Sequence, residues 1–243
     1  MEKPYYGGPS WHIFSNLITG IFLLVIALYG GLFEHPLLYL LLIPSIYFFI
    51  NAFRWRRGEF LEERLRIRDE LIKFVKPRDG DRVLDVGTGA GLLAIGFAKV
   101  INEGEIVGID RWIPLGGGTS LKTALKNAEI EGVSGKVKFV EGDARNIPYP
   151  DNYFDIVVSS FVIHIIRKGR DDALKEMIRV LKPGGKFAII EPKREVWTGW
   201  VVDDRLISKL SELGLRNIKL RTFTINYPKK RDVYIIYGEK REI

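Results

Sequence analysis

The residue pattern with the clearest chemical meaning is a short apolar run that passes through an acid into a glycine-rich turn. Residues 82–91 read Arg-Val-Leu-Asp-Val-Gly-Thr-Gly-Ala-Gly, which places Asp85 before Gly87, Gly89 and Gly91. Glycine is required where a strand turns tightly into a helix and where the backbone must approach a ligand, because a Cβ would clash there. The pattern therefore predicts a turn that builds a nucleoside pocket.

Two further acids stand where a nucleoside would need them. Asp110 closes a predicted strand roughly 20 residues after the glycines, and an acid at that place can accept hydrogen bonds from both hydroxyls of a ribose. Asp143 follows the next predicted strand, where its carboxylate can accept a hydrogen bond from an adenine amino group. A small-molecule cofactor is therefore the first expectation.

The elements that must position these residues are indicated by apolar, β-rich runs that alternate with helical patterns. Five strands are predicted, at Arg82–Val86, Glu105–Ile109, Val137–Glu141, Phe154–Ser159 and Lys186–Glu191. Such alternation is typical of an α/β fold with a doubly wound, Rossmann-like, mostly parallel sheet. The tail adds a predicted helix at Val201–Leu213 and an antiparallel strand pair at one sheet edge, Ile218–Ile225 and Val233–Tyr237.

In this order and spacing the motifs closely resemble the class I S-adenosylmethionine-dependent methyltransferases, especially the branch that includes the ubiquinone and menaquinone biosynthesis methyltransferases. The resemblance covers about Arg82 to Glu191 and includes Arg-Val-Leu-Lys-Pro-Gly-Gly at 179–185. It implies S-adenosyl-L-methionine as the cofactor. A dehydrogenase shares the strand, the turn and the distal acid, but its glycines are spaced G-x-G-x-x-G, and no second nucleotide-binding half is evident here.

The resemblance also implies which residues bind the cofactor, and for each of them turn geometry, helix capping or packing is the structural alternative. The methionine part is assigned to Asp85, Gly87, Thr88, Gly89 and Gly91. The ribose and adenine are assigned to Asp110, Arg111, Trp112, Asp143 and Ala144, and the pocket wall at the end of the fourth strand to Ser159.

Methyl transfer from a sulfonium is an in-line displacement in which the cation loses its charge, so the site must chiefly orient the acceptor and exclude water. A dedicated catalytic side chain is not obligatory. Where the acceptor must lose a proton, His164 after the fourth strand and Glu191 at the end of the fifth are the candidate bases, and a capping or packing role is the alternative for both. With no cysteine and three scattered histidines, a metal site is not expected.

The N-terminal region has a different composition. Ile13–Phe33 and Leu37–Phe53 are almost continuously apolar, and spans of roughly 17–21 residues reach about 26–31 Å as helices, close to the hydrocarbon thickness of a bilayer. Residues 1–55 are therefore predicted to form a transmembrane hairpin. Arginines that follow the second run place the catalytic domain in the cytoplasm. A soluble hairpin packed on the domain or on a partner, and a cleaved signal peptide, are the alternatives.

Residues 56–80 are predicted to form an amphipathic connecting helix and a turn, and 81–243 the methyltransferase domain. The net charge of +7 is compatible with nucleic acid, an anionic membrane or a solvated surface. The long connection 111–120 contains three consecutive glycines and is a candidate lid over the cofactor, with a plain loop as the alternative.

The hairpin favours an acceptor in or at the lipid bilayer, either a membrane-associated small molecule such as a quinone precursor or a lipid head group, because tethering raises its effective concentration. A methyltransferase for RNA or protein with the hairpin as a mere anchor is the second hypothesis. The sequence shows no RNA-binding module, so nucleic acid is not a favoured partner. A non-enzymatic, membrane-anchored cofactor-binding protein is the third. The sequence leaves the oligomeric state open.

Overall fold

The computed structural model describes residues 2–6, 10–33, 35–57, 59–113, 119–225 and 230–242. The chain divides into two compact units. We call Gly7–Glu62 the helical unit, and Met1–Tyr6 together with Glu63–Ile243 the α/β unit. The residues that precede the helical unit in sequence therefore belong to the α/β unit.

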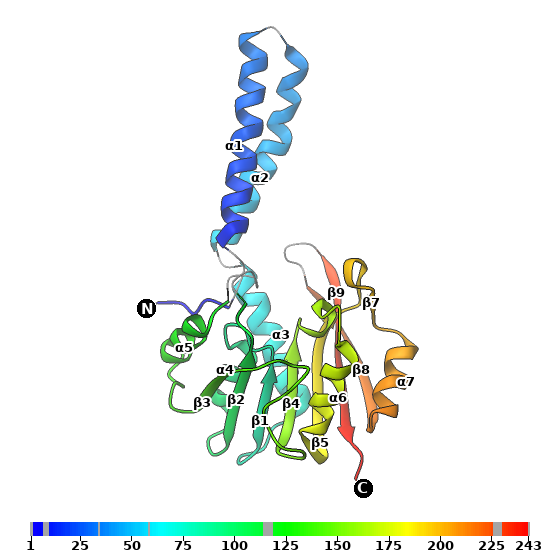
Figure 1. Cartoon of the computed structure of the whole chain (residues 1–243). Coiled ribbons are helices and arrows are strands. Elements are labelled where there is room, and N and C mark those ends of the chain that lie inside the picture. The colour runs from blue at the N-terminus through cyan, green and yellow to red at the C-terminus, as the bar shows by residue number, and fades with distance from the viewer. Residues whose placement is uncertain are drawn as a thin grey trace. The chain divides into compact units, whose positions relative to one another are not determined.

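The helical unit contains α1 (Ser10–Leu32), the 3-10 helix η1 (Pro36–Leu41) and α2 (Leu42–Arg57). The two long helices run antiparallel (Figure 1). They approach closely at Gly20, where a Cβ would lie 3.3 Å from the ring of Phe49, and the buried Ser45 hydroxyl donates to the Gly20 carbonyl at 2.8 Å. Small residues thus let the two backbones come together.

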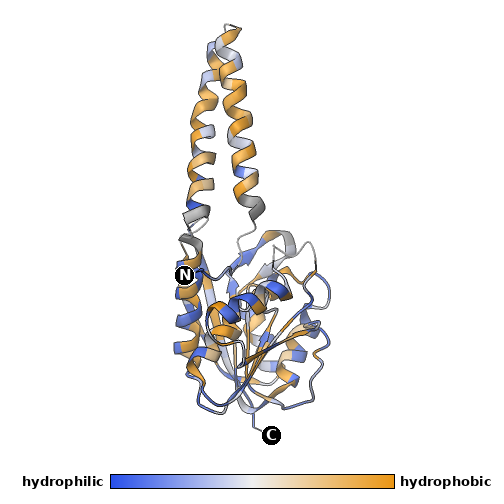
Figure 2. Ribbon diagram, turned by 90° about the vertical axis from the view of Figure 1, so that its left-hand side faces the viewer, coloured by the Kyte–Doolittle hydropathy of each residue, from blue (hydrophilic) through white to orange (hydrophobic). Residues whose placement is uncertain are grey.

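Most large apolar side chains of this unit face outward. Phe14, Phe22, Ile43 and Ile50 are all more than half exposed, and hydrophobic residues cover most of the length of α1 and α2 (Figure 2). Two segments, Ile13–Leu32 and Pro36–Arg54, are long and apolar enough to cross a membrane by length and composition. These exposed apolar side chains therefore do not take part in packing α1 against α2.

The α/β unit is built on a seven-stranded sheet in the order β3-β2-β1-β4-β5-β9-β8. Its strands are β1 (Arg82–Val86), β2 (Glu105–Asp110), β3 (Val137–Glu141), β4 (Phe154–Ser160), β5 (Leu181–Pro192), β8 (Leu215–Ile225) and β9 (Arg231–Lys240). Its helices are α3 (Glu59–Val75), which begins within the helical unit, α4 (Leu92–Val100), α5 (Leu121–Ile130), α6 (Arg170–Arg179) and α7 (Asp204–Glu212). The first five strands are parallel and β9 is antiparallel to both neighbours, which confirms the predicted Rossmann-like fold.

The order of the strands changes direction between β1 and β4. The chain moves outward from β1 through β2 to β3, and then in the opposite direction from β4 to β5. Because such crossovers are right-handed, α4 and α5 cover one face of the sheet and α6 covers the other. Open α/β sheets bind ligands at the carboxyl ends of the strands where this direction changes. The residues after β1 and after β4 therefore lie at the place where a ligand is expected.

The central strands are buried on both faces, which is why they appear in the sequence as mainly apolar runs. Leu84, Val157 and Phe187 are fully buried in neighbouring strands, and Phe154 and Met177 join the same core cluster. This packing makes the sheet a rigid base for the loops at its edge.

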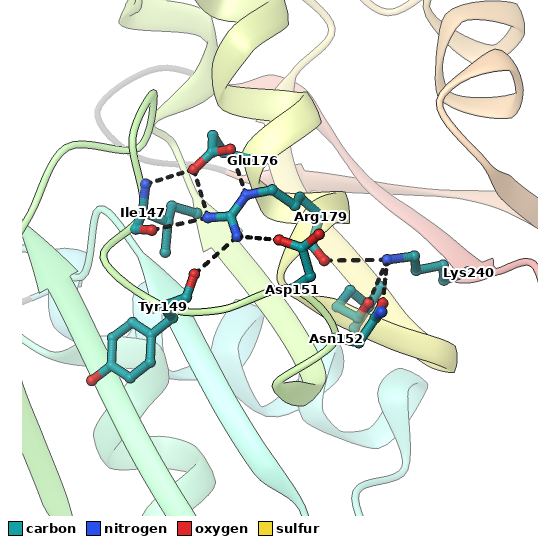
Figure 3. Close-up of polar contacts among 8 residues, drawn as sticks. Ile147, Tyr149, Asp151, Asn152, Glu176, Arg179 and Lys240 are labelled. Carbon is teal, nitrogen blue, oxygen red and sulfur yellow. Dashed lines mark hydrogen bonds and ion pairs between the residues drawn. The ribbon is translucent and has the colours of Figure 1, made fainter.

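Arg179, the last residue of α6, fixes the loop between β3 and β4 (Figure 3). Its Nε donates to Glu176 at 2.6 Å, and its Nη atoms donate to the carbonyls of Ile147 and Tyr149 and to the carboxylate of Asp151. These carboxylates raise the pKa of Arg179 above its ordinary value. The arginine thus holds the loop that follows Asp143 from several sides.

Candidate functional site

The glycine turn between β1 and α4 adopts a backbone that other residues rarely accept. Gly87, Gly89 and Gly91 have φ values of +72°, +55° and +87°. A Cβ on Gly87 would also collide with the side chain of Val162, from the segment after β4. The turn therefore requires glycine for its conformation and for the close approach of a neighbouring loop.

Asp85 ties this turn to the first turn of α4. Its side chain is buried, and one carboxylate oxygen accepts hydrogen bonds from the Thr88 hydroxyl at 2.7 Å and from the Ala94 N–H at 3.0 Å. Burial raises the pKa of Asp85 to about 7. Both predicted binding residues, Asp85 and Thr88, are thus engaged with each other behind the turn, and a direct role toward the methionine part stays a prediction.

Asp110 lies at the carboxyl end of β2 and faces the glycine turn. Its two carboxylate oxygens accept from the Gly89 N–H at 2.9 Å and from the Trp112 N–H at 2.8 Å. The Trp112 indole N–H in turn donates to the Gly89 carbonyl at 2.8 Å. A carboxylate has about four acceptor positions, so two remain for a pair of ribose hydroxyls. The donor and acceptor set fits the nucleoside of S-adenosylmethionine.

Asp143 is held by a neighbour that the sequence analysis missed. Arg145 donates to both of its carboxylate oxygens, at 2.9 and 2.6 Å, and Arg111 lies 3.6 Å from one of them. Hydrogen bonds from Arg145 hold the pKa of Asp143 down at about 2. Ala144 packs against the core cluster beside it. Most acceptor positions of Asp143 are therefore used within the protein, and its contact with adenine stays a prediction.

Ser159 is fully buried near the end of β4. Its hydroxyl donates to the Val86 carbonyl at 2.8 Å, so it links β4 to β1 near the carboxyl ends of the two strands. The structure gives it a role in the sheet, and its place in the wall of a cofactor pocket stays a prediction.

The two candidate bases, predicted separately, lie together. Glu191 at the end of β5 is fully buried, and one of its oxygens lies 2.6 Å from His164 Nδ1. The same carboxylate accepts the backbone N–H groups of Val162, Ile163 and His164, which form the 3-10 turn η2 (Ile163–Ile165) and its approach. Where Nδ1 donates to Glu191, the lone pair of Nε2 is available as a proton acceptor.

This His164 segment lies against the glycine turn, because Val162 occupies the space beside Gly87. Phe161, with φ +58°, presents its ring edge-on to His164 at 6.3 Å between ring centroids. His164 and the glycine turn are therefore linked through Val162, in the segment that follows β4.

Arg170, a second residue that sequence reasoning missed, supports the histidine from below. Its guanidinium donates to the carbonyls of Ile163, His164 and Thr198, and lies over the ring of Trp200 at 5.3 Å. Thr198 and Trp200 belong to a small hairpin that follows β5, formed by β6 (Arg194–Glu195), η3 (Val196–Thr198) and β7 (Trp200–Val201). Arg170 thus connects the His164 turn to this hairpin.

Part of the expected site lies outside the described residues, namely positions 114–118 of the candidate lid. Among the residues that the structure describes, no group of three or more histidines, cysteines or acids could hold a metal ion.

The comparisons with known proteins agree with the fold. Residues 84–189 match the family described as "Methyltransferase domain". The ubiquinone/menaquinone biosynthesis C-methyltransferase of Azotobacter vinelandii is 37% identical over 115 residues, which is 47% of this chain and 43% of that protein. The corresponding enzyme of Pseudomonas fluorescens is 38% identical over the same shares. The chain thus spans less than half the length of these curated relatives.

Solved structures share the fold. A SAM-dependent methyltransferase from Aquifex aeolicus is 25% identical, with a TM-score of 0.55 over 71% of this chain and 89% of that one. Phosphoethanolamine N-methyltransferase 2 of Haemonchus contortus, solved with S-adenosyl-L-methionine, is 17% identical, with a TM-score of 0.58 over 73% and 53%. The [4+2]-cyclase SpnF is 22% identical, with a TM-score of 0.59 over 73% and 81%. Residues 84–189 are therefore a methyltransferase domain, and its fold is that of solved S-adenosylmethionine-dependent methyltransferases.

Proposed function

We propose that this protein transfers a methyl group from S-adenosylmethionine to a membrane-associated acceptor, either a small molecule such as a quinone precursor or a lipid head group. The observation that carries the proposal is the presence of a methyltransferase domain and two helices of membrane-spanning length and composition in one chain. Within residues 1–55, the two apolar segments then form a two-span anchor, 56–80 is the connection, and 81–243 is the catalytic domain on the cytoplasmic side of the cell membrane.

Bound at the carboxyl ends of β1 and β2, the cofactor supplies an electrophilic methyl group. The backbone of the glycine turn, with Asp85 and Thr88 behind it, holds the methionine part. Asp110 accepts hydrogen bonds from the ribose hydroxyls at the acceptor positions that the N–H groups of Gly89 and Trp112 leave unused. The nucleoside is surrounded by Arg111, Trp112, Asp143 and Ala144. These residues orient the methyl donor and exclude water, which is the main requirement of the displacement.

His164 accepts the proton that an acceptor hydroxyl, amine or activated carbon must lose. Glu191 keeps the ring oriented and stabilises the imidazolium that forms, because its carboxylate contacts Nδ1. Glu191 is therefore a positioning residue, since it is buried and its oxygens are turned to the His164 segment. Such proton transfer contributes typically 10²–10⁴-fold to a rate.

The anchor supports a lipid-phase acceptor by mass action. A tether raises the effective concentration of an acceptor confined to the same bilayer without any new contact. Resistance of the protein to extraction from membranes by high salt and alkaline pH tests the spanning hairpin. Release into the soluble fraction would contradict it and favour a hairpin packed on a partner.

Two alternatives have observations in their favour. The net charge of +7 suits a methyltransferase for RNA or protein that the hairpin merely localises. The likeness to a solved [4+2]-cyclase shows that this fold also occurs in a protein named for other chemistry, which keeps a role other than methyl transfer in view. Whether a labelled methyl group enters the lipid, the RNA or the protein of the host distinguishes these alternatives from the proposal.

The cofactor site is tested by titrating S-adenosylhomocysteine into the full chain in detergent. We expect Asp110→Ala to weaken binding by roughly 100-fold or more, because two hydrogen bonds to a charged acceptor are lost. The fold should persist, with an unchanged far-UV circular dichroism spectrum. An unchanged affinity would show that the ribose is bound elsewhere.

A further inference from the structure

We propose that residues 2–6, which precede the helical unit, are part of the support of the cofactor turn, and that Asn127 transmits this support. The inference rests on the proposed role of the glycine turn in cofactor binding. It assigns Asn127 as a positioning residue and gives the N-terminal segment a role in affinity for S-adenosylmethionine.

Asn127, on α5, joins the N-terminal segment to the glycine turn. Its side chain is 1% exposed. Its Oδ1 accepts the Tyr5 N–H at 2.8 Å, and its Nδ2 donates to the Tyr5 carbonyl at 2.7 Å and to the Ala90 carbonyl at 2.9 Å. Ala90 lies between Gly89 and Gly91 in the turn. One buried amide thus contacts both segments at once.

Tyr6 anchors the same segment next to this amide. Its side chain is 2% exposed, and its hydroxyl donates to Glu131 at 2.7 Å. Glu131 also contacts Lys99 on α4 at 2.5 Å and Arg68 on α3 at 3.8 Å. Burial raises the pKa of Tyr6, which keeps the hydroxyl protonated and able to donate. The segment is therefore attached to α5 and, through Glu131, linked to α3 and α4.

The hydrogen bonds explain how the segment acts on the turn. Two of the three contacts of the Asn127 amide are with the Tyr5 backbone, and together they fix which way the amide points. A buried amide that loses these partners must rotate or bring in water to satisfy its polar atoms. Its remaining contact with Ala90 then weakens, and the turn becomes less ordered for the cofactor.

The arrangement also joins the two ends of the helical unit chemically. Tyr6 precedes that unit in sequence and Arg68 follows it, and both reach the carboxylate of Glu131. Because coupling free energies are reciprocal, cofactor binding must strengthen the attachment of residues 2–6 as much as their attachment strengthens cofactor binding.

A pair of variants at Tyr5 isolates the contact. Tyr5→Ala and Tyr5→Pro both remove the ring, but only proline lacks the N–H that donates to Asn127. In a titration of the full chain in detergent, we expect Tyr5→Pro to bind S-adenosylhomocysteine about five- to tenfold more weakly than Tyr5→Ala, the effect of one hydrogen bond. Equal affinities of the two variants would overturn the proposal.

Hydrogen exchange on the unaltered protein gives a second test that needs no variant to fold. Addition of saturating S-adenosylhomocysteine should slow exchange at the Tyr5 amide together with the glycine turn. Unchanged exchange at Tyr5 beside a protected turn would refute the coupling. Asp110→Ala separates the two levels of the argument: if it still binds normally, the proposed cofactor site is wrong, and if it does not, the Tyr5 results judge the inference alone.

Discussion

Glu191 contacts His164 at both the ring and the backbone, and this decides which nitrogen is available for chemistry. The carboxylate lies 2.6 Å from Nδ1 and accepts the N–H groups of the same turn. The ring side chain is 12% exposed, so it is held in place and is still reachable. These contacts support our proposal that Nε2 is the proton acceptor.

We expect His164→Asn to lower kcat by about 10²–10⁴-fold, because the proton acceptor is lost. Affinity for S-adenosylhomocysteine should stay the same, since His164 is not placed in the cofactor site. His35→Asn, in the helical unit, is the matched control and should leave kcat unchanged. Steady-state kinetics on an acceptor-containing lipid extract provide the measurement, and a full kcat in His164→Asn would remove the histidine from the mechanism.

Asp85 should make stability depend on pH. Its pKa rises from 3.8 unfolded to about 7 folded, so the folded protein holds a proton that the unfolded chain has released. Its stabilising contribution is therefore complete below about pH 4 and is lost as pH rises to about 7, by at most about 4 kcal/mol.

Asp85→Asn retains an oxygen that can accept from Thr88 and Ala94 and does not titrate. Between pH 4 and 7 the wild type should lose stability relative to the variant, as judged by the free energies of unfolding. Above pH 7 the difference should stay constant. Denaturant titrations of the cofactor-free protein in detergent give the comparison. Parallel pH profiles of the two proteins would contradict the raised pKa.

The residues of the turn could be predicted because glycine and acid at strand ends have few other uses in combination. Arg145, Arg170 and Asn127 could not, since an arginine or an asparagine on a helix or loop is most often solvated. Which groups they contact depends on the tertiary structure, and only the fold reveals that Arg145 donates hydrogen bonds to the Asp143 carboxylate. The Asp143 carboxylate accordingly has fewer acceptor positions for a ligand than the sequence suggested.

At the scale of elements, Arg179 is the residue that fastens α6 to the loop between β3 and β4. Lysine keeps the charge but lacks the several directed donors of the guanidinium. We expect Arg179→Lys to destabilise the α/β unit by about 2 kcal/mol, since contacts with two partly buried carbonyls are lost. Thermal unfolding by differential scanning fluorimetry measures the shift.

The nearly fully exposed Arg205 supplies the control, because Arg205→Lys should change stability by less than about 0.5 kcal/mol. An equal effect of the two substitutions would mean that the Arg179 network contributes nothing beyond a surface charge.

The bounds of β1 and β3 match the prediction, and β2 and β4 each extend one residue further, to Asp110 and Ser160. The central strand β5 was predicted too short, because it begins at Leu181, five residues before the predicted start at Lys186. β8 and β9 are longer than predicted, at Leu215–Ile225 and Arg231–Lys240, because an edge pair carries charged residues that hide its strand pattern. The predicted helix from Val201 begins at Asp204, since the Asp203 side chain caps it by accepting the Leu206 N–H. The hairpin of β6 and β7 was missed because two-residue strands leave no periodicity.

At the scale of the whole molecule, the division into two units follows the change of composition along the chain, with one exception. Residues 2–6 belong to the α/β unit although the helical unit separates them from it in sequence. Glu-Lys-Pro-Tyr-Tyr has no periodicity that could predict this. The attachment depends on Asn127 and Glu131, whose roles emerge only from tertiary structure.

The most direct test of the membrane-acceptor proposal is the destination of a labelled methyl group. The full chain in nanodiscs made from host lipids would be supplied with labelled S-adenosylmethionine together with host RNA and protein, with Asp110→Ala as the inactive control. The proposal predicts label in the lipid extract of the wild-type reaction alone. Label confined to RNA or protein would contradict a membrane-associated acceptor, and absence of label from every fraction despite cofactor binding would contradict methyl transfer itself.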